Sequence, residues 1–359
     1  MNTLLLAPEL FTTDSGIPRI LRLYLKALCD LAGPDDHVRF IALNDTSVDS
    51  ADLRPYSLPD VLERWEACGR DKGRFVRNTL GLSSGIKLIV CGHVAQLPVA
   101  WLASRLRPGL RYALVAHGIE AWRPFGFWER RALKGAWRVL CVSEFTRNEI
   151  LKNVQLDPAR VIVLPNALDP NLHPDGIDSA HITTSQPVIL AVSRLSASDN
   201  YKGIDHLIAA MPAVLAAAPG TKLRIVGRGD DIHRLQNLVR EHRVDAAVEF
   251  AGYVDDRQLR HEFARCTVFA LPSQKEGFGL VYLEAMSHGK PCIAAQAGGA
   301  PEVITPESGL LVPYGDVPAL AAACANALSA SWDAAAIRAC AARFSYPVFL
   351  ANVKRLLAA

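Results

Sequence analysis

One pattern repeats along the whole sequence: a short run of apolar residues is followed by a longer stretch in which apolar residues recur at helical spacing. The apolar runs lie at residues 3–7, 38–43, 86–91, 112–116, 139–142, 161–164, 188–192, 223–226 and 267–271. Strands that alternate with helices are typical of a parallel sheet covered on both faces. Ligands bind such sheets at the carboxyl ends of the strands. The pattern therefore predicts an α/β fold, with any site in the loops after these runs.

The length and one polar segment predict two domains. A chain of 359 residues is long enough for about two domains. Residues 166–187 are polar and contain Pro170, Pro174 and Pro187, which is typical of a linker. A series of alternating strands and helices lies on each side of this segment, so we place the domain boundary within it.

The composition excludes several classes of protein. Hydrophobic residues make up 50% of the chain and charged residues 21%, as in a globular protein. No apolar run approaches the ~18 residues of a membrane-spanning helix. Residues 1–9 lack the basic start of a signal peptide, so we expect a buried first strand there. The 8 cysteines form no C-x-x-C pair, which predicts neither a zinc site nor a disulfide framework and indicates a reducing cytoplasm.

Basic residues concentrate in the first half of the chain. Residues 1–165 contain 22 Lys and Arg against 17 Asp and Glu, whereas the remainder contains 17 against 19. Two stretches there, Arg64–Arg77 and Trp122–Arg131, mix arginine with tryptophan, a combination suited to the interface between water and lipid headgroups. The alternative is a solvated face with core-facing aromatic residues. An anionic membrane surface is thus a candidate partner, whereas nucleic acid is not, because no dense basic stripe is present.

Two glutamates follow the apolar run at 267–271. Glu276 lies in the loop after the run, and Glu284 lies eight positions later, about one turn inside a predicted helix. A Gly-Phe-Gly sequence at 277–279 separates them where the strand gives way to the helix. Free N–H groups and the helix dipole make such a junction an anion site, which glycine allows a ligand to approach closely. The alternative is an ordinary glycine-rich turn followed by a solvated glutamate.

Two cations bracket another loop between a strand and a helix. Arg194 follows the run at 188–192, and Lys202 precedes Gly203 at the start of an amphipathic helix. Two cations beside a helix N-terminus suit a diphosphate. The pair predicts a diphosphate clamp, although each residue by itself is typical of a surface charge.

The first half has two further candidates at strand ends. Gly16 lies in the turn between the first strand and the first helix, where Ser15 or Asp14 could instead be an ordinary helix cap. His117 follows the strand at 112–116 and precedes Gly118. A histidine there is either structural or points to a ligand at the edge of the sheet.

These features together resemble the retaining glycosyltransferases of family 4, which have the GT-B fold. In that family two glutamates separated by seven residues form the donor-sugar site, followed by a Gly-Lys-Pro strand start like that at 289–291. The resemblance implies two Rossmann-like domains facing across a deep cleft. Residues 1–168 would bind the acceptor, 169–343 the nucleotide sugar, and 344–359 would form a helix that returns to the N-terminal domain. Two positions depart from the pattern: Ser15 replaces a family glycine, and Ala167 replaces another.

The resemblance also implies roles for individual residues. Glu276 would hold the sugar hydroxyls, Glu284 the ribose hydroxyls, and His117 the sugar near its 6-position. The predicted catalytic residues are Glu276 and His117, and the predicted donor-binding residues are Gly16, Arg194, Lys202, Val254, Gly277, Phe278, Gly279, Leu280 and Glu284. Val254 is included among the donor-binding residues because its segment resembles the family segment whose backbone contacts the nucleobase.

The implied reaction is transfer of a hexose, of mannose or glucose type, from a nucleotide-diphosphate sugar to an acceptor hydroxyl with retention of configuration. The acceptor would be lipid-linked or a polysaccharide intermediate, and the enzyme would be cytoplasmic or peripheral on the inner membrane face. No D-x-D follows a strand, so we expect no metal, and no cofactor. Two alternatives stay open: a non-hydrolysing nucleotide-sugar epimerase and a non-catalytic nucleotide-sugar-binding subunit.

Overall fold

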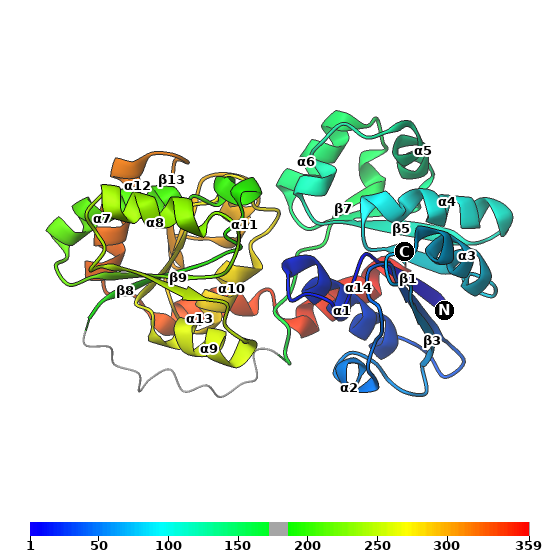
Figure 1. The fold of residues 1–359 in the computed structure, drawn as a ribbon. Helices are drawn as coiled ribbons and strands as arrows, with labels where there is room; N and C mark the ends of the chain where they lie inside the picture. The colour runs from blue at the N-terminus through cyan, green and yellow to red at the C-terminus, as the bar shows by residue number, and fades with distance from the viewer. Residues whose placement is uncertain (172–185, 359) are drawn as a thin grey trace. The chain divides into compact units, whose positions relative to one another are not determined.

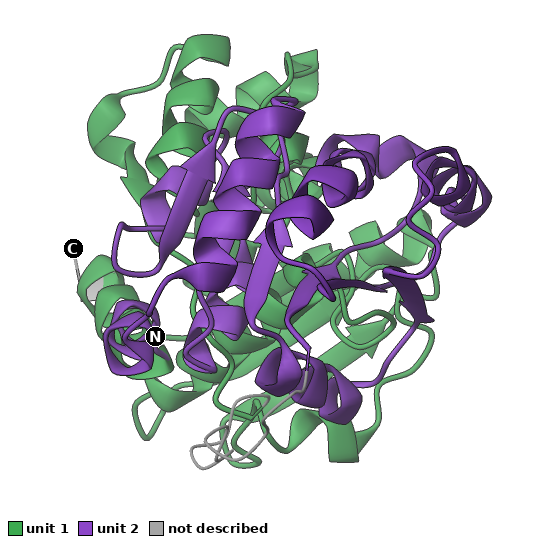
Figure 2. Ribbon diagram, turned by 90° about the vertical axis from the view of Figure 1, so that its left-hand side faces the viewer, with its two compact units in different colours: residues 1–171, 346–359 green, residues 172–345 purple. Residues whose placement is uncertain are grey.

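The structure is a computed structural model that describes residues 1–171 and 186–358 (Figure 1). The chain divides into two compact units. Unit 1 comprises residues 1–171 and 346–359, and unit 2 comprises residues 172–345 (Figure 2). Residues 172–185 of the predicted linker lie outside the described residues.

Unit 1 is built on a parallel sheet of seven strands in the order β3-β2-β1-β4-β5-β6-β7. The strands are β1 (Thr3–Ala7), β2 (Val38–Ala42), β3 (Leu62–Ala67), β4 (Leu88–Cys91), β5 (Arg111–Ala116), β6 (Arg138–Cys141) and β7 (Val161–Val163). The helices are α1 (Gly16–Asp30), α2 (Ser50–Leu53), α3 (Lys72–Leu82), α4 (Leu97–Leu106), α5 (Phe127–Gly135), α6 (Glu144–Asn153) and α14 (Tyr346–Ala358), with 3-10 turns η1 (Val94–Gln96), η2 (Ile119–Ala121) and η3 (Pro158–Arg160).

Strand β1 shows why the apolar runs predicted this sheet. All five of its residues are buried, and successive side chains enter opposite cores, as the two-residue period of a strand requires. Leu4 and Leu6 belong to one hydrophobic cluster, whereas Leu5 and Ala7 belong to the other. The core on the Leu5 side also contains Phe349 of α14. The C-terminal helix therefore completes the core of unit 1, as the family resemblance implies.

Unit 2 contains a second parallel sheet, in the order β10-β9-β8-β11-β12-β13. Its strands are β8 (Val188–Val192), β9 (Lys222–Val226), β10 (Val248–Gly252), β11 (Val268–Leu271), β12 (Cys292–Ala295) and β13 (Gly309–Val312). Its helices are α7 (Ile204–Ala217), α8 (Ile232–Glu241), α9 (Asp256–Arg265), α10 (Leu280–Ser287), α11 (Ala300–Val303), α12 (Val317–Ser329) and α13 (Ala334–Ala342), with a 3-10 turn η5 (Ala197–Lys202). The chain runs from β8 to β9 on one side of the sheet and from β11 to β12 on the other side. The carboxyl ends of the adjacent strands β8 and β11 therefore form a switch point, where ligands bind such folds.

One strand of unit 1 was not predicted from the sequence. The apolar runs did not predict β3, because Leu62–Ala67 is an edge strand in which three of the six residues are charged. No helix among the described residues has the length and apolar character needed to cross a bilayer.

Candidate active site

Lys202 and Glu276 meet at the carboxyl edge of the unit 2 sheet, although 74 residues separate them in the sequence. Lys202 ends η5, in the connection after β8, and Glu276 lies in the loop after β11. Lys202 Nζ donates to Glu276 Oε2 over 2.8 Å, and both side chains are mostly buried. The fold therefore brings one predicted phosphate-binding cation against the predicted sugar-binding carboxylate.

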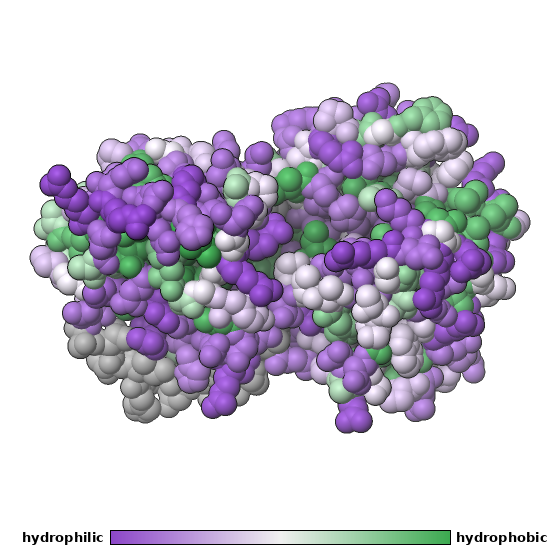
Figure 3. Space-filling view, viewed as in Figure 1, coloured by the Kyte–Doolittle hydropathy of each residue, from purple (hydrophilic) through white to green (hydrophobic). Residues whose placement is uncertain are grey.

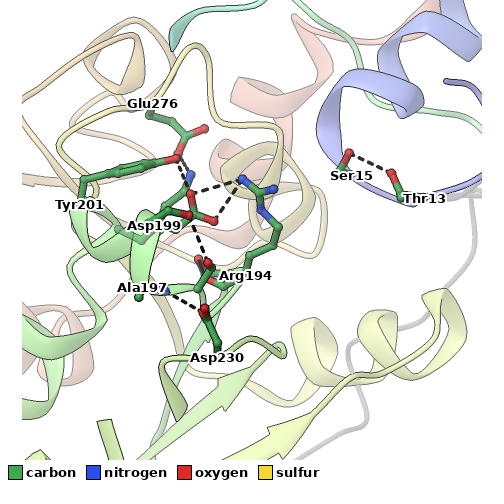
Figure 4. A network of polar contacts seen from close by, with 12 residues as sticks. Thr13, Ser15, Arg194, Ala197, Asp199, Tyr201, Asp230 and Glu276 are labelled. Atoms are coloured by element: carbon green, nitrogen blue, oxygen red, sulfur yellow. Dashed lines mark hydrogen bonds and ion pairs between the residues drawn. The ribbon is translucent and has the colours of Figure 1, made fainter. Parts of the chain in front are cut away.

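Arg194 is held at the same edge by a carboxylate that the sequence analysis did not identify. The guanidinium Nη2 lies 3.1 Å from Asp199 Oδ2, and the Tyr201 hydroxyl donates to Asp199 Oδ1 over 3.0 Å (Figure 4). Asp199 is buried, whereas the Arg194 side chain is 71% exposed. Burial, with Asp199 close by, raises the pKa of Tyr201 to about 12, so Tyr201 is a neutral donor to Asp199. Asp199 thus holds the Arg194 guanidinium in place, while most of the Arg194 side chain remains exposed to solvent.

The loop of η5 is fastened to the next strand connection as well. The Ala197 N–H donates to Asp230 Oδ1 over 2.9 Å (Figure 4). The Leu195 N–H donates to the Arg228 carbonyl, and a Cβ on Gly229 would come within 2.0 Å of the Leu195 carbonyl oxygen. Only glycine fits between these two backbones, so the loops after β8 and β9 support each other.

The Gly-Phe-Gly turn contains a backbone conformation that glycine adopts without strain and other residues do not. Gly279 has φ 95°, and a Cβ there would lie 2.3 Å from Tyr282 Cδ2. The Phe278 side chain is buried and packs on Phe344 with ring centroids 5.3 Å apart. A contact from Phe278 to a ligand would therefore come from its backbone. Leu280 is the first residue of α10, where free helix N–H groups favour an anion.

Helix α10 is tied to the sheet by its buried residues. The Tyr282 hydroxyl donates to the Leu271 carbonyl of β11 over 2.6 Å. Glu284 is buried on this helix, and its carbonyl oxygen lies 2.9 Å from His288 Nδ1. Because a carbonyl only accepts, His288 Nδ1 carries the proton, and burial lowers the pKa of His288. The helix that carries Glu284 is therefore tied to β11 through Tyr282, and the His288 ring closes its C-terminal end.

Two glycines outside the predicted site set the position of Glu276. The Gly299 N–H donates to the Glu276 carbonyl over 2.7 Å. A Cβ on Gly298, where φ is 59°, would lie 2.4 Å from the same oxygen. In the sequence, the sign of this role is the Gly-Gly pair before the Ala-Pro-Glu that opens α11.

Gly16 and His117, two of the other predicted site residues, belong to unit 1. Gly16 opens α1 after Ser15, whose side chain does not cap the helix and instead lies 3.2 Å from Thr13 Oγ1 (Figure 4). His117 Nε2 donates to the Gly92 carbonyl over 2.9 Å, and its backbone N–H donates to Glu120. Burial lowers the pKa of His117, which favours a neutral ring.

Val254 follows β10 in unit 2 and is partly buried. The Gly227 N–H at the end of β9 donates to the Gly252 carbonyl at the end of β10 over 2.8 Å. Arg228 lies over the Tyr253 ring, 4.7 Å from its centroid. The segment predicted to meet a nucleobase is therefore joined to the loops that hold Arg194.

Two family models match the chain. One, described as Glycosyltransferase Family 4, matches residues 31–172, and the other, described as Glycosyl transferases group 1, matches residues 186–330. The chain belongs to glycosyltransferase family 4. The two matched segments cover most of unit 1 and unit 2 of this family 4 chain respectively.

Curated relatives of this family 4 chain include two mannosyltransferases. The chain is 41% identical over 142 residues to the "GDP-mannose-dependent monoacylated alpha-(1-6)-phosphatidylinositol monomannoside mannosyltransferase" of Corynebacterium glutamicum, covering 38% of this chain and 36% of that protein. It is 32% identical over 255 residues to the "GDP-mannose-dependent alpha-(1-6)-phosphatidylinositol monomannoside mannosyltransferase" of Mycobacterium tuberculosis, covering 65% of each. The chain thus matches from about a third to under two thirds of these relatives' lengths.

A solved structure matches the whole family 4 chain. HepE of Anabaena in complex with UDP aligns over 100% of both chains, with a TM-score of 0.78 and 22% identity. An identity this low shows the fold alone. The predicted class, a GT-B fold of two Rossmann-like units, is confirmed.

Proposed function

We propose that this chain is a retaining glycosyltransferase that moves a hexose from a nucleotide-diphosphate sugar to an acceptor hydroxyl. The observation that supports the proposal most is the cluster at the carboxyl edge of unit 2, where Lys202 pairs with Glu276 and Arg194 lies exposed beside them. A departing diphosphate leaves negative charge on its phosphates and positive charge on the anomeric carbon. Cations beside the phosphates and a carboxylate near the sugar would stabilise that separation of charge.

The proposed roles follow from the chemistry of each group. Arg194, Lys202 and the start of α10 bind the phosphates, which gain charge as the bond breaks. Glu276 accepts hydrogen bonds from sugar hydroxyls and orients the ring for attack on the same face. Glu284 accepts from the two ribose hydroxyls, for which a carboxylate has enough lone pairs. His117, with a neutral ring, would form a hydrogen bond with the sugar, and no residue here is assigned as a covalent nucleophile.

The relatives suggest the class of acceptor and narrow the donors to be tested. Two relatives are named as GDP-mannose-dependent enzymes of phosphatidylinositol mannosides, while HepE was solved with UDP. We propose a lipid-linked sugar as acceptor and a hexose of mannose or glucose type as the group transferred. The enzyme would then act at the cytoplasmic periphery of a membrane.

A donor screen tests the proposal. Thermal melting with GDP, UDP and ADP should show a rise in the melting temperature for one nucleotide, because a ligand of the folded state stabilises it by mass action. The matching nucleotide sugar should then glycosylate a lipid-linked acceptor, and nuclear magnetic resonance should show an α linkage. No stabilisation by any nucleoside diphosphate would contradict the proposal. Conversion of the nucleotide sugar without an acceptor would instead identify an epimerase.

We also propose that turnover needs no divalent cation, because Arg194 and Lys202 supply the positive charge at the phosphates. Activity should therefore persist in EDTA. Complete loss of turnover in EDTA, with recovery on addition of Mg²⁺ or Mn²⁺, would contradict this assignment while leaving the transfer reaction itself intact.

A further inference from the structure

Two neighbouring helices of unit 1, α4 and α5, present large apolar side chains to solvent. Leu106 on α4 is 63% exposed, and Phe127 and Trp128 at the start of α5 are 72% and 58% exposed. Leu102, one turn before Leu106, is exposed too. Hydrophobic residues, in green, appear over this part of unit 1 with hydrophilic residues among them (Figure 3). Exposed apolar groups of this size on one face indicate an interaction site.

The aromatic side chains on this face are held in place by one another. The Trp128 ring lies 6.0 Å from Trp101 of α4 and 5.1 Å, edge to face, from Phe127. Arg131 lies over the Trp101 ring, 5.6 Å from its centroid. These contacts join the two helices, so the exposed rings form a fixed array.

The charge of this face is positive. Helices α4 and α5 together contain Arg105, Arg130, Arg131 and Lys134, all exposed, and a single acidic residue, Glu129. Glu129 lies 2.7 Å from Arg123 Nη2 and also accepts from the Gly126 N–H over 2.8 Å. The acid is therefore neutralised by a neighbour and by the helix start, and the four basic residues keep their charge for a partner.

The other basic stretch, Arg64–Arg77, has a different structure. Glu66 accepts from both Arg64 and Arg74, at 3.1 and 3.3 Å. Trp65 stacks on Phe40 with its ring plane within 10° of parallel. Its charges are thus partly cancelled and its aromatic ring is partly used in packing. Of the two stretches, Trp122–Arg131 has the surface suited to lipid.

We propose that the α4–α5 face, defined by Leu102, Leu106, Phe127, Trp128 and the four basic residues above, docks on an anionic lipid bilayer. The apolar side chains would enter the boundary between headgroups and acyl chains, and the arginines and lysine would contact lipid phosphates, as in other interfacial helices. The functional role of this docking rests on the proposed lipid-linked acceptor. The docking face itself is inferred from the exposed residues and does not depend on that acceptor. It brings unit 1 to the surface where such an acceptor is anchored.

Cosedimentation with vesicles tests the docking. Wild-type protein should bind vesicles of phosphatidylcholine with phosphatidylglycerol at low salt, bind pure phosphatidylcholine vesicles far less, and dissociate as salt rises. Phe127→Ser combined with Trp128→Ser should lower the partition coefficient roughly tenfold or more, because it removes two inserting side chains. Arg105→Glu combined with Arg131→Glu should do the same on anionic vesicles. Trp65→Ser, in the other basic stretch, is the matched control and should bind as wild type does.

Each result bears on the docking separately from the transfer reaction. Every variant should keep the wild-type response to the nucleoside diphosphate in thermal melting, which also shows that it is folded. Equal binding to anionic and neutral vesicles, or wild-type binding by the Phe127 and Trp128 double variant, would overturn the proposal. The proposal would also be overturned if the wild-type protein were a dimer that does not bind vesicles and the double variant were a monomer, because the face would then join two copies of the chain. Failure of the donor screen would overturn the proposed function but not the docking.

Discussion

At the scale of single residues, the proposed donor site contains charged side chains that form ion pairs with one another. Lys202 and Glu276 are ion-pair partners at 2.8 Å, and Asp199 lies beside Arg194 at 3.1 Å. The same two cations would contact the diphosphate of a bound donor in the proposed function. The two glutamates of the motif differ in position, since Glu276 is in a loop and the buried Glu284 is on α10. They should therefore fail differently when their charge is removed.

Glu276→Gln should lower kcat by roughly the 10²–10³ typical of a preorganised polar group, because sugar contacts strengthen as the ring gains charge. Glu284→Gln should mainly raise the KM for the donor, because the ribose changes little during reaction. Steady-state kinetics separates the two effects. In calorimetry the free nucleoside diphosphate should bind Glu276→Gln nearly normally and Glu284→Gln more weakly. The reverse order would show that the two assignments are exchanged.

Asp199 should act through Arg194. Asp199→Asn keeps the size of the side chain and an acceptor for Tyr201 but removes the charge, so it should raise the KM for the donor roughly three- to tenfold. Asp230→Asn is the matched control, because Asp230 caps the same loop through Ala197 but is not paired with Arg194. Equal kinetic effects of the two substitutions would mean that only the loop conformation matters.

At the scale of elements, the turn between β11 and α10 depends on one backbone conformation. Gly279 has φ 95° with Tyr282 directly beside it, and Tyr282 in turn holds the carbonyl of Leu271. A side chain at position 279 would have to displace a fully buried ring. The turn therefore fixes the N-terminus of α10, which is proposed to bind the donor phosphates.

Gly279→Ala should cost at least ~1–2 kcal/mol of stability, the cost of a left-handed residue with a Cβ, and more from the clash. Donor binding should fall with it. Gly81→Ala in α3 is the control: no atom lies within 4 Å of the added Cβ, and alanine favours the helix, so stability should be unchanged or slightly higher. Chemical denaturation measures both, and a Gly279→Ala protein as stable as wild type would refute the strain.

The sequence predicted the elements whose pattern is continuous and missed those defined by pairing across the fold. Apolar runs located β1 and β11, but the edge strand β3, with three charged residues among six, has too few apolar residues to be recognised. Asp199 is one of several polar residues in its loop, and no local pattern shows which of them is buried. The Lys202–Glu276 pair depends on strand order, because β8 and β11 become neighbours only in the folded sheet.

At the scale of the whole molecule, the chain builds unit 1 from both of its ends. Tyr346 at the start of α14 donates from its hydroxyl to Asp30 Oδ2 over 2.6 Å, and Phe349 packs edge to face on Tyr24 at 5.1 Å. These contacts join residues more than 300 positions apart, so unit 1 is complete only when the last helix is in place. Unit 2 lies between the two parts in sequence and has its own core.

Phe349→Ala should therefore destabilise unit 1 by ~3–5 kcal/mol, the usual cost of removing a buried phenylalanine. Val348→Ala, on the exposed side of the same helix, should cost little. Hydrogen exchange would show faster exchange in β1 and β2, while β8 and β11 keep their protection. Equal loss of protection in both units would contradict an independent core in unit 2.

In the proposed function, the carboxyl edge of unit 2 binds a nucleotide through its diphosphate. The most direct test is calorimetric titration of matched nucleoside mono- and diphosphates into wild-type protein and into Arg194→Ala combined with Lys202→Ala. Wild-type protein should bind the diphosphate of one base more tightly than the monophosphate, and the double variant should lose this difference because the two cations proposed to bind phosphate are gone. A wild-type protein that binds both equally, or a double variant that keeps the preference, would contradict it.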